Sequence, residues 1–289
     1  MPLVRVRDIY RRARQSGYGV GGFCAENSDM VQAIIAAAEE TRSPLVLVLW
    51  QEDILAVGPG YLEAFAQYAA QRSTVPIALM ADHASSLAFC LTCILNGHSG
   101  VMIDGSHLPL SENIHLTRRV CEIAHLADVL VEGELGTVRR TFEAAGPYAG
   151  QTVFTDPDEV AEYVSRSGVD ALAVSIGTES GVSPQPPQVD FDRLRRIARA
   201  TDAYLVLHGG SGTPHEVVRE LVREGITAMR FASALRIAYL DAIEQARVKL
   251  GRDYPDTRYI LGPARDAVRQ IVAGYMHSLG CAGQADRCW

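Results

Sequence analysis

Short apolar runs alternate with longer amphipathic segments along the whole chain. Most of the short runs are almost continuously apolar, which is typical of strands that are buried on both faces of a parallel sheet. The segments between them, such as residues 30–40 and 114–125, repeat apolar residues at helical spacing. The predicted strands are Tyr18–Ala25, Leu45–Leu49, Ile77–Ala81, Gly100–Ile103, Asp128–Val131, Ala171–Ser175, Tyr204–Leu207 and Thr227–Phe231.

Eight strand-then-helix units predict an α/β fold in which the strands close into a TIM (β/α)8 barrel. The chain length of 289 residues suits one such barrel. An extra C-terminal helix is expected at about residues 262–277, after the eighth unit. Because no linker or shift in composition divides the sequence, we expect a single domain over residues 1–289.

Composition and charge narrow the class of protein. The chain is 48% hydrophobic and carries a formal net charge of −7, which fits a globular protein and disfavours nucleic-acid binding. Five arginines between residues 5 and 14 are expected on the solvated side of a first helix. No apolar segment reaches the ~18 residues of a membrane span. The six scattered cysteines are interpreted as core thiols of a cytoplasmic protein.

Polar side chains follow one predicted strand after another. In a barrel of this type, the carboxyl ends of the strands meet at one mouth, where active sites are built. Two histidines and several carboxylates at this mouth predict a site for a divalent metal of the zinc class. These residues are Asp82, His83, Asp104, Glu132, Glu134, Glu179 and His208.

The segment HGGSG, residues 208–212, predicts a place for an anion. Glycines allow backbone N–H groups to approach a phosphate closely, and the loops after the seventh and eighth strands are the usual phosphate site of this barrel. Arg230, near the end of the eighth strand, offers a planar cation to phosphate or carboxylate. The candidate substrate contacts are Gly181, Gly209, Gly210, Ser211, Arg230 and Ser233.

At these residues the chain resembles the class II, metal-dependent aldolases, in particular the tagatose- and ketose-bisphosphate branch. The segments MIDGSHLPLSEN, VEGELG and LHGGSG carry a resemblance that covers nearly the whole length. It implies an aldehyde-lyase that uses a divalent ion, usually zinc, and forms a homodimer or homotetramer. It also implies that His83 and His208 are metal ligands and that Asp82 transfers a proton. Glu134 and Asp104 would lie near an alternative metal position.

The sequence also departs from the family pattern around the mouth. Ser180 stands where the family has a third ligand histidine, and Pro184 where it has a lysine near the phosphate. Arg230 replaces an asparagine that contacts the substrate. The paired glycines that let the loop after the fifth strand move are absent from TVRRTF, residues 137–142. These changes predict altered substrate specificity.

Three functions remain open from the sequence. The first is an aldolase for a ketose phosphate or a related anionic carbonyl compound, with the metal on His83, His208 and either Glu179 or Glu134. The second is a metal-independent enzyme of a specialised biosynthetic pathway, in which Asp82 and Glu179 act as acid and base. The third is a sugar-phosphate-binding subunit without catalysis.

Overall fold

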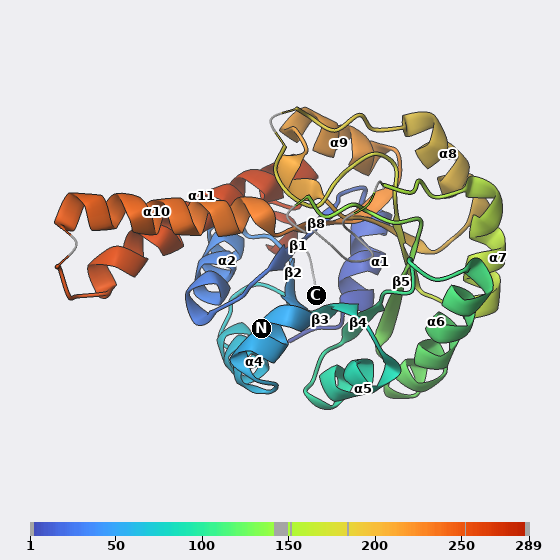
Figure 1. Cartoon of the computed structure of the whole chain (residues 1–289), viewed down its shortest axis with the longest axis horizontal. Coiled ribbons are helices and arrows are strands. Elements are labelled where there is room, and N and C mark those ends of the chain that lie inside the picture. Colours follow the sequence, from blue (N-terminus) through green and yellow to red (C-terminus); the bar gives the residue numbers. More distant parts are fainter. Residues whose placement is uncertain (1–2, 142–149, 151, 184, 252, 287–289) are drawn as a thin grey trace.

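The structure, a computed structural model, describes residues 3–141, 150, 152–183, 185–251 and 253–286 (Figure 1). Eight strands close into a barrel in chain order, and every neighbouring pair is parallel. The predicted TIM barrel is therefore confirmed. The strands are β1 Val20–Cys24, β2 Leu45–Trp50, β3 Ile77–Ala84, β4 Gly100–Ile103, β5 Leu130–Leu135, β6 Ala171–Val174, β7 Tyr204–Leu207 and β8 Ile226–Phe231.

Helices cover the outside of the barrel (Figure 1). Several of them begin at polar side chains that accept a hydrogen bond from the first turn, as Asn27, Ser86, Asp156 and Asp190 do. The helices are α1 Val6–Ser16, α2 Ser28–Thr41, α3 Gln51–Val57, α4 Tyr61–Gln71, α5 Leu87–Leu95, α6 Leu110–Ala124, α7 Pro157–Ser167, α8 Phe191–Ala200, α9 His215–Arg223, α10 Ser233–Leu250 and α11 Arg258–Leu279.

Two strands run several residues further than the sequence predicts, while β2 and β8 are each longer by a single residue, Trp50 and Ile226. β3 continues past Ala81 to Ala84, and β5 begins at Leu130 and continues past Val131 to Leu135. The expectation that Asp82, His83, Glu132 and Glu134 follow their strands is therefore wrong, since all four are strand residues. Two of them are hydrogen-bonded to other ionisable side chains, His83 to Asp104 and Glu132 to both His208 and Arg230, and such pairing lowers the cost of burying a charge.

Helix α1 lies across the amino-terminal end of the barrel, where it contacts β1, β2, β3 and β8. Some of its arginines face solvent as expected, but they also bind the segments that directly precede β6 and β7. Arg7 donates to Asp170 at 2.7 Å before β6, and Arg14 donates to the carbonyl oxygens of Asp202 and Ala203, each at 2.7 Å. This end of the barrel is thus occupied by α1, and the opposite mouth remains for chemistry.

Helices α10 and α11 form an arm that projects from the barrel (Figure 1). The extra C-terminal helix, expected at residues 262–277, is α11 Arg258–Leu279. It packs along α10 and α2 and also contacts α9 and β1. Within the described part of the chain, no helix is long and apolar enough to cross a membrane.

The described cysteines are buried and unpaired, as expected for thiols of the core. Burial raises the pKa of the thiols of Cys90, Cys93, Cys121 and Cys281 to about 12, which keeps them in the unreactive protonated form. Cys288 lies outside the described residues.

Candidate active site

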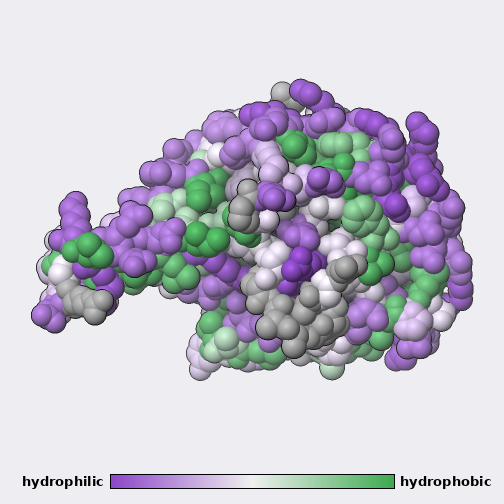
Figure 2. Space-filling view, turned by 45° about the horizontal axis from the view of Figure 1, so that its top comes forward, coloured by the Kyte–Doolittle hydropathy of each residue, from purple (hydrophilic) through white to green (hydrophobic). Residues whose placement is uncertain are grey.

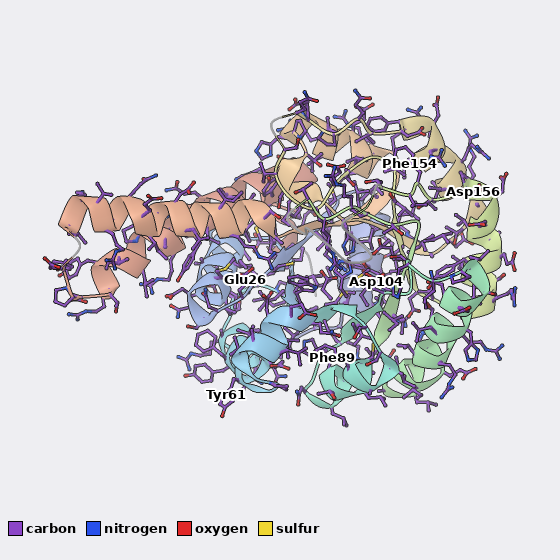
Figure 3. All side chains as sticks on the ribbon, in the orientation of Figure 1. Glu26, Tyr61, Phe89, Asp104, Phe154 and Asp156 are labelled. Carbon is purple, nitrogen blue, oxygen red and sulfur yellow. The ribbon has the colours of Figure 1, made fainter. Side chains whose placement is uncertain are left out.

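A cavity opens at the carboxyl ends of the strands. Figure 3 shows Asp104 toward the middle of the barrel, whereas Tyr61 points outward from α4. Strand ends and the following loops contribute the lining, as in other barrels of this type. The lining residues are Cys24, Trp50, Asp82, His83, Arg140, Ser180, Gly181, His208, Gly209, Ser211, Arg230, Ala232, Ser233 and Arg236.

An irregularity in β3 directs His83 into this cavity. The register between β3 and β4 shifts between Ala81 and Ala84, and His83 has a φ of 48°. A residue with a side chain rarely adopts this left-handed conformation, and strain of this kind is concentrated at functional sites. The bulge turns the imidazole toward His208 on the other side of the mouth.

Each histidine is held by a buried carboxylate. Nδ1 of His83 lies 2.7 Å from Asp104 Oδ2, and Nε2 of His208 lies 3.0 Å from Glu132 Oε1. Because an ionised carboxylate only accepts, these two nitrogens carry the ring protons. A carboxylate behind a histidine fixes the ring and its tautomer, as it commonly does behind metal ligands.

The other two ring nitrogens face each other. Nε2 of His83 and Nδ1 of His208 are 3.1 Å apart, and in neutral rings both present a lone pair. Two facing lone pairs repel each other unless a cation shares them. Zinc–nitrogen bonds of about 2.1 Å in a tetrahedral site separate two ligand nitrogens by little more than this distance. The donors therefore fit a divalent ion, and Asp82, whose Oδ2 is 3.9 Å from His83 Nε2, is within reach of it.

A second group of carboxylates lies on the other side of His83. Nδ1 of His83 is 3.9 Å from Glu134 Oε2, and Asp104 completes a set that could also hold a cation. Burial and the charge of Asp104 raise the pKa of Glu134 to about 8, so this carboxyl is largely protonated at neutral pH. Its Oε2 has no hydrogen-bond partner among the described residues.

Charges in the cavity act in opposite directions on Asp82 and His83. Burial alone would raise the pKa of Asp82, but His83, His208, Arg230 and Arg140 outweigh it and lower that pKa. Burial would lower the pKa of His83, but the charge of Asp82 and the hydrogen bond to Asp104 raise it to about 9. Asp82 is thus an ionised carboxylate at neutral pH.

Arg230 lies deeper than the expected position of an anion anchor. Its side chain is buried inside the barrel, where it pairs with Glu132 and donates to the hydroxyl of Tyr10 at 3.0 Å. Its Nε lies 3.8 Å from Asp82 Oδ1. Gly22 leaves room for this side chain, since a Cβ there would lie 2.6 Å from Arg230 Nη1. Arg230 therefore balances buried carboxylates beneath the cavity.

Glu179 and Ser180 occupy different sides of the loop after β6. Glu179 lies 3.6 Å from Arg139 and lines a neighbouring hollow, and it belongs to neither group of described side chains that could hold a metal. Ser180 lines the main cavity. Its backbone pairs with the loop after β5: its N–H donates to Arg139 at 2.9 Å, and its carbonyl accepts from Thr141 at 2.9 Å. Pro184 lies outside the described residues.

The predicted phosphate contacts gather on one side of the cavity. Ser233 is the first residue of the 18-residue helix α10, whose N-terminus faces the cavity and favours an anion. Gly209 has a φ of 77°, and a Cβ on it would lie 2.5 Å from the carbonyl oxygen of Glu179. The hydroxyl of Ser211 accepts from Ala232 N at 3.1 Å, and Gly210 is buried.

The roles of some residues in and behind the cavity were not predicted from the sequence. Glu132 was noticed only as a polar residue at a strand end, yet it pairs with both His208 and Arg230. Trp50 received no role, although two arginines lie over its ring: Arg140 at 5.4 Å and Arg236 at 5.2 Å from the ring centroid. Trp50 directly follows a predicted strand, and this position could have placed it at the mouth of the barrel.

The family profile described as "Fructose-bisphosphate aldolase class-II" matches residues 4–284, almost the entire chain. The chain belongs to the class II fructose-bisphosphate aldolase family. The prediction of a class II aldolase, an aldehyde-lyase, is therefore confirmed at the level of the family. Class II aldolases are metal-dependent, and the groups containing His83 match that requirement.

Relatives of this aldolase cover nearly its full length. It is 35% identical over 306 residues to the fructose-bisphosphate aldolase of Thermus caldophilus, with 98% of this chain and 100% of the relative covered. It is 33% identical over 284 residues to the D-tagatose-1,6-bisphosphate aldolase subunit GatY of Klebsiella oxytoca, with 98% and 100% covered. The crystal structure of the YdjI aldolase of Escherichia coli K12 superposes with a TM-score of 0.85 at 27% identity, covering 98% and 100%.

Proposed function

We propose that this class II aldolase makes or breaks a carbon–carbon bond beside the carbonyl of a ketose phosphate or a related anionic compound, with substrate specificity different from that of its relatives. The observation that carries the proposal is the pair of facing nitrogens, His83 Nε2 and His208 Nδ1, 3.1 Å apart. Each is oriented by a carboxylate behind its ring, Asp104 and Glu132 respectively. We propose zinc as the ion.

The residues that would hold the ion are His83 and His208, with the carboxylate of Asp82 within reach. When bound, such an ion polarises the substrate carbonyl and stabilises the negative charge that develops on its oxygen. Asp104 accepts the proton at Nδ1 of His83, which leaves Nε2 as the ring nitrogen that would bind the ion. Glu132 accepts the proton at Nε2 of His208, which leaves Nδ1 for the same ion. We place Glu134 and Asp104 at an alternative cation position on the far side of His83.

In the cleavage direction, Asp82 is the base. Its lowered pKa keeps it ionised, so it can take the proton from the hydroxyl on the carbon that becomes the aldehyde. The carbon–carbon bond then breaks, and its electron pair moves toward the carbonyl. Glu134, whose pKa is raised to about 8, is a proton donor for the resulting carbanion. Condensation runs through the same steps in reverse.

The phosphate would rest against backbone N–H groups and the hydroxyl of Ser233 at the start of α10, with Gly181 and Gly209 on the facing loops. Arg230 is not included among these contacts, because Glu132, Tyr10 and Asp82 already engage its guanidinium. No observation favours acid–base catalysis by Asp82 and Glu179, because Glu179 lines the neighbouring hollow beside Arg139. None favours a subunit without catalysis.

Metal analysis tests this proposal. We expect about one divalent ion per chain in the purified protein, loss of aldol cleavage on chelation, and recovery on adding zinc. Ser180→His, which restores the family's third ligand, should tighten zinc binding measured by competition with a chromophoric chelator. Glu179→Gln is the matched control and should leave zinc affinity unchanged. A metal-free preparation with full turnover would exclude the proposal.

A further inference from the structure

The glycine-rich loop after β7, residues 208–212, rests on a row of packed aromatic rings. The ring centroid of Phe231, the last residue of β8, lies 5.2 Å from that of Phe23 on β1 and 4.1 Å from that of Tyr275 on α11. Gly210 approaches this row closely, since a Cβ on it would lie 2.7 Å from Phe231 Cε1. Packed rings form a rigid apolar support, so the loop lies against a fixed surface.

Tyr275 also holds the main chain of this loop. Its hydroxyl donates to the carbonyl oxygen of Ser211 at 2.9 Å. Burial raises the pKa of Tyr275 above its usual value, so the hydroxyl keeps the proton that it donates. The hydroxyl of Ser211 in turn accepts from the amide of Ala232 at 3.1 Å. Both the main chain and the side chain of Ser211 are therefore held in place.

The hydrogen bond from Tyr275 fixes the direction of one peptide group. In a trans peptide the C=O and N–H bonds point to opposite sides. The carbonyl of Ser211 points to Tyr275, which is not among the described residues that line the cavity, so the N–H of Gly212 points away from α11. An anion is attracted by N–H groups and repelled by carbonyl oxygens. This orientation of the 211–212 peptide therefore favours a phosphate at the loop.

The turn that contains this peptide has a second conformation open to it. Thr213 N donates to Gly210 O at 3.0 Å, which places Ser211 and Gly212 at the centre of a four-residue turn. Reversing the central peptide of such a turn keeps the closing hydrogen bond but requires a positive φ at the second central residue. Glycine adopts a positive φ readily, whereas alanine is disfavoured there about tenfold. Gly212 does not have a positive φ in the structure, so the observed orientation is the one that Tyr275 stabilises.

We propose that Tyr275 is a positioning residue for the substrate phosphate: by holding the carbonyl of Ser211, it keeps the 211–212 peptide in the orientation that accepts an anion. The inference rests on the proposed function and deepens it, because it assigns control of phosphate affinity to a side chain of α11. Tyr275 acts through the loop and does not contact the substrate. A reversed peptide would direct a carbonyl oxygen toward the phosphate and weaken its binding.

Calorimetric titration with inorganic phosphate, on full-length protein freed of metal by chelation, measures this affinity without turnover. Tyr275→Phe removes the hydroxyl and keeps the ring against Phe231. Tyr239→Phe is the matched control: Tyr239 is 9% exposed and Tyr275 is 7% exposed, but the hydroxyl of Tyr239 bonds to Asp29 and not to the loop. Thermal unfolding checks that each variant is folded.

We expect Tyr275→Phe to weaken phosphate binding about fivefold, and to raise the KM of a phosphorylated substrate by a similar factor with little change in kcat. Tyr239→Phe should stay within about twofold of the parent. Adding Gly212→Ala to Tyr275→Phe should recover most of the lost affinity, because alanine disfavours the reversed peptide. There is room for this methyl group, since a Cβ at position 212 would lie 3.5 Å from its nearest neighbour, Gly181 O.

Equal phosphate affinity of Tyr275→Phe and the parent overturns the inference, and so does an equal loss in Tyr239→Phe. A loss in Tyr275→Phe that Gly212→Ala does not recover overturns it as well. Tyr275-dependent phosphate binding in a protein whose turnover proves independent of metal overturns the proposed function alone. Metal-dependent aldol turnover, with phosphate affinity and KM unchanged by Tyr275→Phe, overturns this inference alone.

Discussion

At the scale of single residues, the centre of the site is a chain of buried polar side chains. It runs from Tyr10 on α1 through Arg230 and Glu132 to His208 and His83. Each member is satisfied in the interior by its neighbour, and the charges of Arg230 and Glu132 compensate each other. The balance between these groups, rather than any single ligand, keeps the two histidines in place.

We predict that Arg230→Met lowers the free energy of unfolding by about 3–5 kcal/mol, because it leaves the carboxylate of Glu132 buried without its cation. The double variant with Glu132→Gln should recover much of this loss. Denaturant unfolding of the four combinations measures the coupling. Arg166→Ala, which breaks the exposed pair with Glu162, is the control and should cost no more than about 1 kcal/mol. Additive effects of the two buried substitutions would contradict the prediction.

The residues of the site were predictable where residue type and position near a strand end were enough to identify them. Asp82, His83, Asp104, Glu134 and His208 come together as expected, because polar residues at barrel strand ends converge. The depth of a side chain was not predictable. A position near the end of a strand does not tell whether a long side chain faces the mouth or the barrel interior. Arg230 illustrates this, because its direction depends on Glu132 and on the room left by Gly22.

At the scale of elements, the strand pattern was predictable and some strand ends were not. β4 and β7 have the predicted bounds, because each is a short apolar run between polar residues. β3 and β5 continue through charged residues, which sequence reasoning treats as breaks. Partners that satisfy those charges come from strands far away in the sequence, such as Arg230 for Glu132.

Two glycines with the same backbone conformation allow the effect of a steric clash to be separated from that of backbone strain. Gly209 and Gly283 share a φ of 77°, but only at Gly209 would a Cβ meet backbone, 2.5 Å from the carbonyl oxygen of Glu179. Gly283→Ala should cost about 1–2 kcal/mol of stability from backbone strain alone. Gly209→Ala should cost more and should also raise the KM for a phosphorylated substrate, because the loop of Glu179 must shift. Equal stability and kinetics of the two variants would contradict this account.

We predict that His98, which lies between α5 and β4, makes the stability of the protein sensitive to acid. Its Nδ1 donates to the carbonyl of Cys93 at 2.9 Å, and burial lowers its pKa to about 4. In the unfolded chain this imidazole takes up a proton at about pH 6.5. The contribution of His98 to the free energy of unfolding is therefore present above pH 6.5 and is lost as the pH falls through about 4. Across this pH range the free energy of unfolding falls by about 3 kcal/mol on account of His98.

His98→Asn keeps a donor for Cys93 but has no titrating ring, so its stability should change less between pH 7.5 and pH 4.5 than that of the wild type. Urea unfolding at several pH values measures the difference. His115→Asn, an exposed position on α6, is the control and should retain the wild-type pH dependence. If the two variants lose stability in parallel with falling pH, His98 is not the responsible group.

At the scale of the whole molecule, the arm of α10 and α11 is the feature that departs from a simple barrel (Figure 2). Large apolar side chains are exposed along it: Leu240 is 62% exposed, Val248 78% and Tyr259 59%. The sequence predicted an added helix but not that it projects, because its direction depends on tertiary packing of α11 against α10 and α2. The one-domain organisation stays a prediction.

We predict that the arm joins copies of this chain in a homodimer or homotetramer. Leu240→Glu and Val248→Glu should shift the mass measured by light scattering toward that of one chain, because a charge cannot be buried in an apolar contact without a partner. Leu126→Glu, at a leucine outside the arm that is 88% exposed, should leave the mass unchanged. A wild-type protein that runs as a single chain at micromolar concentration would refute the prediction.

The bridge between Ser180 and the segment 139–141 uses main-chain atoms, apart from the hydroxyl of Thr141. The backbone pairing at the mouth consequently does not depend on which side chain occupies position 180. An ancestor that exchanged a histidine for a serine there could keep the same loop geometry while its chemistry changed. The scaffold thus allows new substrates to be explored without refolding the site.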